Sequence, residues 1–118
     1  MWEVELYATV DGQEVVADFL DNLPRKHRAK AIWEIELLAV QGTGLTLPYV
    51  KHIDGELWEL RIKFASDISR IFYFIPVKNK IVLLHGFVKK TDKTPPGEIA
   101  TAQKRLCDYK ERHSNEYQ

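Results

Sequence analysis

The stretch that decides the fold is residues 57–90, "LWELRIKFASDISRIFYFIPVKNKIVLLHGFVKK". It holds three runs rich in β-branched and aromatic residues, at about 57–64, 69–76 and 80–88. Such runs are typical of strands, and connections this short favour antiparallel hairpins. The pattern therefore predicts a three-stranded antiparallel unit that turns at Ala65-Ser66 and again at Lys78-Asn79.

The residues before this stretch predict a strand, two helices and a loop. Residues 2–8 alternate and indicate a short strand. Asp11 is a candidate cap for a first helix, and Pro24 opens a second helix that stops near Gly42. Residues 43–56 are expected to form a loop. The second helix is expected to bury a broad apolar surface made of Ile32, Trp33, Ile35, Leu37, Leu38 and Val40.

The residues after the three strands predict one more helix. Thr94 is its expected cap, and Pro95 and Pro96 fit the first turn because their missing N–H groups are not needed there. Its apolar face consists of Ile99, Ala102, Leu106 and Tyr109. The element order is β-α-α-β-β-β-α. The chain therefore predicts a single α+β domain over residues 1–118, with helices on one face of a small antiparallel sheet.

The composition narrows the class of protein. A chain of 118 residues, 45% of them hydrophobic, suits one core. No apolar run approaches the roughly 20 residues that span a membrane, and the first residues lack the basic segment of a signal peptide. Cys107 is the only cysteine, which excludes an internal disulfide and a cysteine metal cluster. We therefore expect a cytoplasmic protein without membrane association, metal or cofactor.

The formal net charge is zero, but the charges are unevenly spread. Residues 1–22 contain six Asp or Glu and no Lys or Arg, whereas residues 61–93 contain eight Lys or Arg and two Asp. The local field, rather than the net charge, decides what a surface attracts. The basic middle of the chain is therefore either ordinary solvated charge or a site for an anion.

Side chains alternate along a strand, so the predicted sheet has two distinct faces. The hairpins place Arg61 opposite Arg70 and Arg70 opposite Phe87. They also place Phe72 opposite His85. The expected core face carries Ile71, Tyr73, Ile75, Val82, Leu84 and Val88. The second face carries Arg61, Arg70, Phe72, His85, Phe87 and Lys89.

Two adjacent arginines repel each other, so their pairing needs an explanation. One explanation is salt bridges with Glu59 or with the acidic first arm. The other is a site for a polyanion, because arginine forks match phosphate geometry. Exposed Phe72 and Phe87 would then offer rings on which bases stack.

Lysines extend the second face at its rim. The last strand leads Lys89 and Lys90 to this rim, and Lys93 lies just beyond. With the two arginines they could surround one phosphodiester. Lys63 and His85 complete the set of residues expected to bind RNA.

The motifs "LWELR", "SRIFYF", "VLLHGFVKKTDKTP" and "EIATAQKR" occur in this order over roughly residues 45–110. In this combination the chain resembles the RelE/HigB-type toxins of bacterial toxin–antitoxin systems, in the phage-derived branch of the RelE/ParE superfamily. The resemblance implies a small α+β toxin that is neutralised by a cognate antitoxin, typically a helix-turn-helix protein, in a toxin–antitoxin heterotetramer. It also implies an RNA-binding hydrolase that cuts mRNA on the ribosome and inhibits translation.

The resemblance also implies which residues act. The family's functional positions are basic residues on the concave sheet face, and they correspond here to Arg61, Arg70, Lys89 and Lys90. Some relatives also use a histidine or a C-terminal tyrosine, for which His85 and Tyr109 are candidates.

Metal-free RNA cleavage uses the ribose 2′-OH as nucleophile and needs a base, an acid and charge stabilisation at the phosphate. Arg61 and Arg70 suit the last role because they stay protonated, and Lys89 or Lys90 could serve as acid or base. His85 has the intrinsic pKa for either role, and a half-buried structural role is its alternative. The chain offers no paired carboxylates and no metal-ligand spacing.

Two other functions fit the same sequence. A ParE-like protein of this fold would inhibit DNA gyrase by binding it, without cleaving RNA. A plain interaction domain would use the charged face to bind an acidic protein. Cleavage of mRNA in the ribosomal A site separates the first hypothesis from these two, whereas gyrase-dependent DNA damage supports the second.

Overall fold

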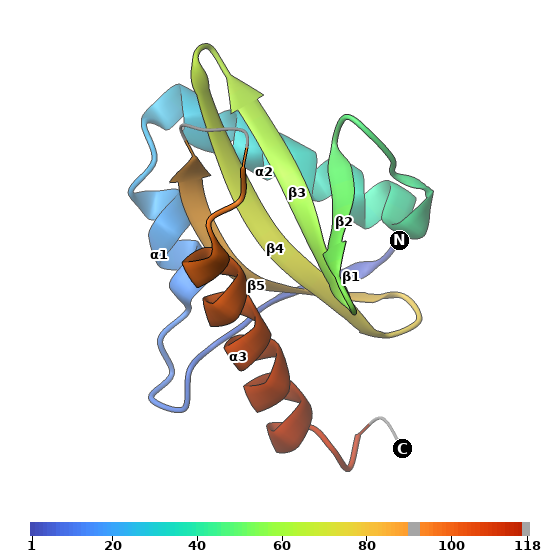
Figure 1. The fold of residues 1–118 in the computed structure, drawn as a ribbon. Coiled ribbons are helices and arrows are strands. Elements are labelled where there is room, and N and C mark those ends of the chain that lie inside the picture. The colour runs from blue at the N-terminus through green and yellow to red at the C-terminus, as the bar shows by residue number, and fades with distance from the viewer. Residues whose placement is uncertain (90–92, 117–118) are drawn as a thin grey trace.

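The computed structural model describes residues 1–89 and 93–116. Within them lies a five-stranded sheet, in the order β1-β5-β4-β3-β2, together with three α-helices and a short 3-10 helix (Figure 1). In chain order the elements are β1 (Glu3–Leu6), α1 (Val15–Asp21), α2 (Arg25–Gln41), η1 (Gly42–Gly44), β2 (Val50–Asp54), β3 (Leu57–Phe64), β4 (Asp67–Val77), β5 (Lys80–Lys89) and α3 (Pro96–Arg112).

The α+β class and the order of the predicted elements are confirmed, with one strand added. β2 lies within the expected loop 43–56 and pairs antiparallel with β3. β1 pairs parallel with β5, so the sheet is mixed and not purely antiparallel as expected. A parallel pair needs a long connection, which the intervening helices and strands supply here.

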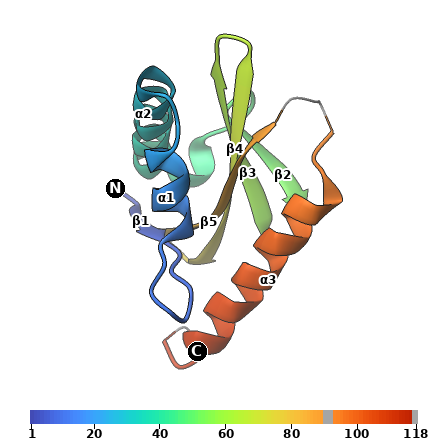
Figure 2. The same ribbon diagram turned by 90° about the vertical axis from the view of Figure 1, so that its left-hand side faces the viewer.

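Helices cover both faces of the sheet, which corrects the expectation of helices on one face. Figure 2 shows α1 and α2 on one side and α3 crossing the other. The reason lies in β4, whose Ile71 and Tyr73 pack beneath α1 and α2 while Phe72 and Phe74 pack beneath α3. A strand buried on both sides reads as a continuous apolar run, as "IFYF" does.

The predicted turns and register are confirmed. Ala65 and Asn79 adopt positive φ angles of 55° and 71° in the two hairpin turns. The expected cross-strand pairs are all present: Arg61 with Arg70, Arg70 with Phe87, and Phe72 with His85.

A β-bulge in β5 alters the predicted faces beyond these pairs. Phe72 pairs with His85 but Tyr73 pairs with Leu83, which leaves Leu84 as an extra residue. The bulge places Val82 and Leu84 in the cluster beneath α3, so their assignment to the opposite face is wrong. Val88, also expected in the core, is 46% exposed.

Two expected helix caps are wrong and one stop is confirmed. α1 begins well after Asp11. The Thr94 hydroxyl bonds to Glu59 instead of capping α3. Gly42 does end α2, with a φ of 52°, and a Cβ there would lie 2.1 Å from the side chain of Trp2. Gly42 is therefore needed for two reasons: its backbone has a positive φ, and the Trp2 side chain lies too close to leave room for a Cβ.

α2 buries less apolar surface than expected. Its fully buried residues are Ala31 and Leu38, together with the polar residues His27 and Glu34, and Ile35 and Leu37 pack half-buried against the same core as expected. Ile32, Trp33 and Val40 are exposed, because the sheet covers only one side of the helix. Among the described helices, none is both long and apolar enough to cross a lipid bilayer.

Candidate functional site

The face of β3 and β4 beneath α3 carries a buried ion pair where two exposed arginines were expected. Arg70 donates from Nη1 to Glu59 Oε1, and Arg61 Nε lies 3.8 Å from the same oxygen. Arg70 is 2% exposed and Glu59 is fully buried, because α3 and its preceding segment cover this face. Salt bridging to Glu59, the first of the two explanations for the arginine pair, is therefore present, and the expected exposure of Arg70 is wrong.

The ion pair leaves part of the Arg70 guanidinium unsatisfied. Its Nε and Nη2 atoms are buried and have no hydrogen-bond partner among the described residues. Buried donors without acceptors are uncommon and costly, so each one calls for an explanation. β3 and β4 thus hold the Arg70 guanidinium in a fixed orientation, and its Nε and Nη2 groups are available to donate to an additional acceptor.

Lys89 and Thr94 complete the cluster from the end of β5. Lys89 Nζ donates to Thr94 Oγ1 at 3.2 Å, and Thr94 Oγ1 donates to Glu59 Oε2 at 3.3 Å. Lys89 is only 3% exposed, in contrast to its expected position at an open rim. Glu59, Arg61, Arg70, Lys89 and Thr94 together are called the charge cluster below.

His85 lies beside this cluster, between two charged side chains of α3. Arg105 Nη1 lies 2.9 Å from His85 Nδ1, and Glu98 Oε1 lies 3.1 Å from His85 Nε2. Because a guanidinium can only donate, Nδ1 must accept, which leaves the proton of a neutral ring on Nε2, where it is donated to Glu98. Burial lowers the pKa of His85, and the charge of Arg105 adds to this shift, although Glu98 opposes it. Both ring nitrogens of His85 are therefore hydrogen-bonded. This fits the half-buried structural role, which was the alternative to a role as acid or base.

The aromatic candidates are not available for stacking with bases. Phe72 is fully buried and Phe87 is 8% exposed, because Ala102 and Leu106 of α3 pack in the same cluster. Their rings contact each other, with centroids 5.3 Å apart. Tyr109 is also buried, and its hydroxyl donates to Glu5. The expectation of exposed rings is wrong for the same reason as that of an exposed Arg70.

Among the cations predicted for the site, those that solvent reaches lie at one end of the sheet. The Arg61 side chain is 33% exposed, and Lys63 and Lys93 are exposed. Lys63 and Lys89 are in the same row of the sheet, because each pairs with Ile68 of β4. Lys90 lies outside the described residues. An anion would therefore meet Arg61 and Lys63 first, with Arg70 and Lys89 behind them.

Sequence reasoning named Glu59 only as one possible salt-bridge partner of the arginines, and it missed the contacts that Thr94, Glu98 and Arg105 make here. The signal for Glu59 was present in "WELR", where alternation puts Glu59 and Arg61 on one face. Glu98 and Arg105 are seven residues apart, two helical turns, and so share a side of α3. That spacing becomes informative only once α3 is known to cover this face. In the described part of the chain, His, Cys, Asp and Glu side chains form no group suited to a metal ion.

One protein family matches most of the chain. Residues 18–107 match the model of a family described as "Phage derived protein Gp49-like (DUF891)". The matched range runs from within α1 into α3 and includes the whole charge cluster. Among curated proteins, the search finds no match to the chain.

Proposed function

Because the chain belongs to the Gp49-like family of phage-derived proteins, a RelE/ParE-like toxin family, we propose that it is the toxin of a type II toxin–antitoxin module. In this proposal it is a HigB-type, metal-independent endoribonuclease. It acts in the cytoplasm as one domain over residues 1–118, cuts mRNA on the ribosome and thereby inhibits translation.

The observation that carries the proposal is a pair of neighbouring arginines. Arg70 is buried and only part of its guanidinium is hydrogen-bonded to the described residues, and Arg61 beside it is partly exposed. Arg70 keeps two donor atoms without an acceptor among residues 1–89 and 93–116, and Arg61 presents a guanidinium to solvent next to it. Arginine forks bind phosphate oxygens through paired N–H groups. Preorganised cations of this kind stabilise negative charge as it develops on a phosphate in the transition state.

The proposed roles follow from position. Arg61 contacts the scissile phosphate, and Arg70 stabilises its charge from behind. Lys63 and Lys93 bind the RNA backbone. Lys89 is the candidate proton donor for the 5′-oxygen. Lys90 is a second candidate for this role, on the basis of the sequence alone. Because Arg70 and Lys89 are buried, their contact with RNA requires the Thr94 bonds to Glu59 and Lys89 to open.

Pulse labelling after induced expression tests the proposal. Incorporation of labelled amino acid should fall within minutes, while incorporation of labelled thymidine continues. The alternative is a ParE-like inhibitor that binds DNA gyrase without cutting RNA. The covered Phe72 and Phe87 rings favour that alternative, because stacking platforms for RNA are closed. Arrest of DNA synthesis with continuing protein synthesis would support it and contradict RNA cleavage.

A toxin of such a module has an antitoxin partner, and we place its binding site on α2. Ile32, Trp33 and Val40 are exposed there and lie at helical spacing on the side away from the sheet. Large apolar side chains exposed together on one side of a helix are typical of a protein interface. In our proposal the partner is a helix-turn-helix protein and the complex is a heterotetramer.

A further inference from the structure

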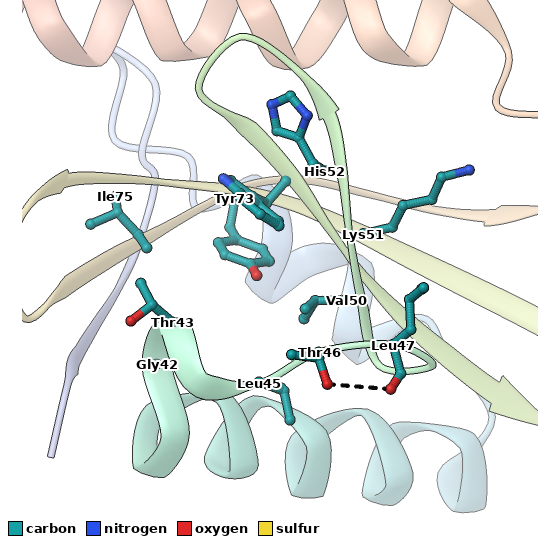
Figure 3. A pocket seen from close by; sticks show the side chains of 11 residues that line it. Gly42, Thr43, Leu45, Thr46, Leu47, Val50, Lys51, His52, Tyr73 and Ile75 are labelled. Atoms are coloured by element: carbon teal, nitrogen blue, oxygen red, sulfur yellow. Dashed lines mark hydrogen bonds between the residues drawn. The ribbon is translucent and has the colours of Figure 1, made fainter.

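A pocket lies on the sheet face opposite the charge cluster. It occupies about 290 Å³ between residues 42–47 and the strands β2, β3 and β4 (Figure 3). Most of its wall is apolar, with Leu45 and Val50 on the loop side and Trp58 and Ile75 on the sheet side. His52 packs edge-on against Trp58, with ring centroids 5.0 Å apart. The size is near the lower end of the range for ligand pockets, about 300 Å³.

One buried polar group is directed into this pocket. Tyr73 is 3% exposed, and Figure 3 shows its hydroxyl pointing from β4 toward the loop that carries Thr43 and Leu45. In the described part of the chain, no hydrogen bond occupies that hydroxyl. It lies on the pocket wall and is not among the side-chain atoms that are sealed from solvent without a partner, so water or a ligand in the pocket can reach it. The pocket therefore combines a mostly apolar wall with one hydroxyl donor that the described protein leaves to a guest molecule.

The protonation state of this group restricts the ligand. Burial raises the pKa of the Tyr73 hydroxyl, so the phenol stays protonated and acts as a donor. The same burial disfavours a carboxylate next to Tyr73. Lys51 also lines the pocket, but it is exposed, and Figure 3 shows its amino group pointing away from Tyr73. The complementary group is therefore a neutral acceptor such as a carbonyl oxygen.

We propose that this pocket binds a small neutral aromatic molecule whose carbonyl oxygen accepts a hydrogen bond from Tyr73. An aromatic ring suits the volume and the wall of Trp58, Ile75 and Val50. The site is separate from the charge cluster, which lies on the other face of the sheet. The binding test below therefore stands independently of the toxin proposal.

Two matched probes test the hydrogen bond. 4-Fluoroacetophenone has the carbonyl, and fluorobenzene has the ring without it, so ¹⁹F NMR titrations compare the two directly. The wild-type protein should bind the ketone about fivefold to tenfold more tightly, the range expected for one net hydrogen bond. Amide signals of Thr43, Thr46 and His52 should shift on titration.

Variants assign the preference to the pocket. Tyr73→Phe keeps the ring and removes the donor, so both probes should bind it equally. Tyr7→Phe is the matched control, because the Tyr7 hydroxyl bonds to Asp108 on the other face and its loss should leave the preference intact. Thr46→Trp, at an exposed position that lines the pocket, should abolish binding of both probes even if Tyr73→Phe does not fold.

Three results would each overturn the inference. The first is equal affinity of the wild-type protein for the two probes. The second is a ketone preference that persists in a folded Tyr73→Phe variant. The third is a set of amide shifts confined to residues away from the pocket, or unchanged binding by Thr46→Trp.

Discussion

Arg70 is the residue at which the stability of the fold and the proposed function meet. The sequence pattern places it on the second face of the sheet, outside the core, where its removal would cost the fold little. The structure reverses this expectation, because Arg70→Ala leaves the buried carboxylate of Glu59 without its direct partner. We predict a loss of about 3 kcal/mol in the free energy of unfolding, the scale for breaking one side of a buried pair. Urea denaturation monitored by tryptophan fluorescence measures it.

Two variants control for this prediction. Glu59→Leu combined with Arg70→Met replaces both charges by apolar groups and should recover most of the stability. Arg25→Ala removes an exposed arginine at the start of α2 and should change the free energy of unfolding little. If Arg70→Ala is as stable as Arg25→Ala, the pair does not hold the cluster together.

Glu34 should give the protein a measurable pH dependence. Burial raises its pKa from an ordinary value of 4.5 to about 7, although Lys30 opposes the shift. The folded protein therefore retains a proton at Glu34 that the unfolded chain has lost. This contribution to stability is fully present below pH 4.5 and is lost as the pH rises through 7. It amounts to about 3 kcal/mol, from roughly 1.4 kcal/mol for each unit of pKa.

Glu34→Gln tests this effect because it removes the titration and keeps the shape. The stability of the variant relative to wild type should increase by about 3 kcal/mol between pH 4.5 and pH 8. Glu36→Gln, at an exposed position of the same helix, is the control and should show no such trend. Parallel pH profiles for wild type and Glu34→Gln would contradict the assignment.

At the level of elements, α1 packs on β5 through a glycine. A Cβ at Gly86 would lie 2.4 Å from the Phe19 ring, so Gly86→Ala must displace that ring and strain the packing of α1 on β5. We predict a loss of roughly 1–3 kcal/mol, typical of overpacking, and partial recovery when Phe19→Leu is added. Gly97→Ala, which has open space around it in α3, should be neutral or slightly stabilising. Equal melting temperatures for the two alanine variants would contradict this packing.

The outward side of α2 should be dispensable for folding and needed for the partner. Trp33 is 51% exposed, so Trp33→Glu should leave the melting temperature nearly unchanged. It should weaken antitoxin binding at least tenfold, since exposed tryptophans are common interface anchors. Isothermal titration calorimetry with the purified antitoxin measures this, with Lys104→Ala, at an exposed position of α3 on the other side of the sheet, as the control. Unchanged affinity would place the interface elsewhere.

The strand pairing was predictable because hairpin turns fix the register, and the Arg61–Arg70 and Arg70–Phe87 pairs followed from it. The position of α3 was not predictable. An apolar stripe shows that a helix packs on the sheet, but it does not show which face of the sheet the helix covers. The burial of Arg70 and Phe72 depends on that choice. The bulge at Leu84 was also missed, since a single extra residue leaves no distinctive local signal.

For the whole molecule, the two covered faces divide the sheet into different environments. The α1 and α2 face holds the Tyr73 pocket, and the α3 face holds the charge cluster. Ion pairing with Glu59 explains why the two arginines are tolerated next to each other. In our proposal an anion binds at the Arg70 donors that have no acceptor among the described residues, and the closed charge cluster opens before it acts.

Single-turnover cleavage of mRNA on programmed ribosomes tests the central claim most directly. Arg61→Ala is the informative variant, because Arg61 is partly exposed and its removal leaves the Arg70–Glu59 pair intact. The wild-type protein should cut A-site mRNA, Arg25→Ala should cut at the same rate, and folded Arg61→Ala should cut on the order of 100-fold more slowly. No cleavage by the wild-type protein, or cleavage by Arg61→Ala at the wild-type rate, would contradict the account.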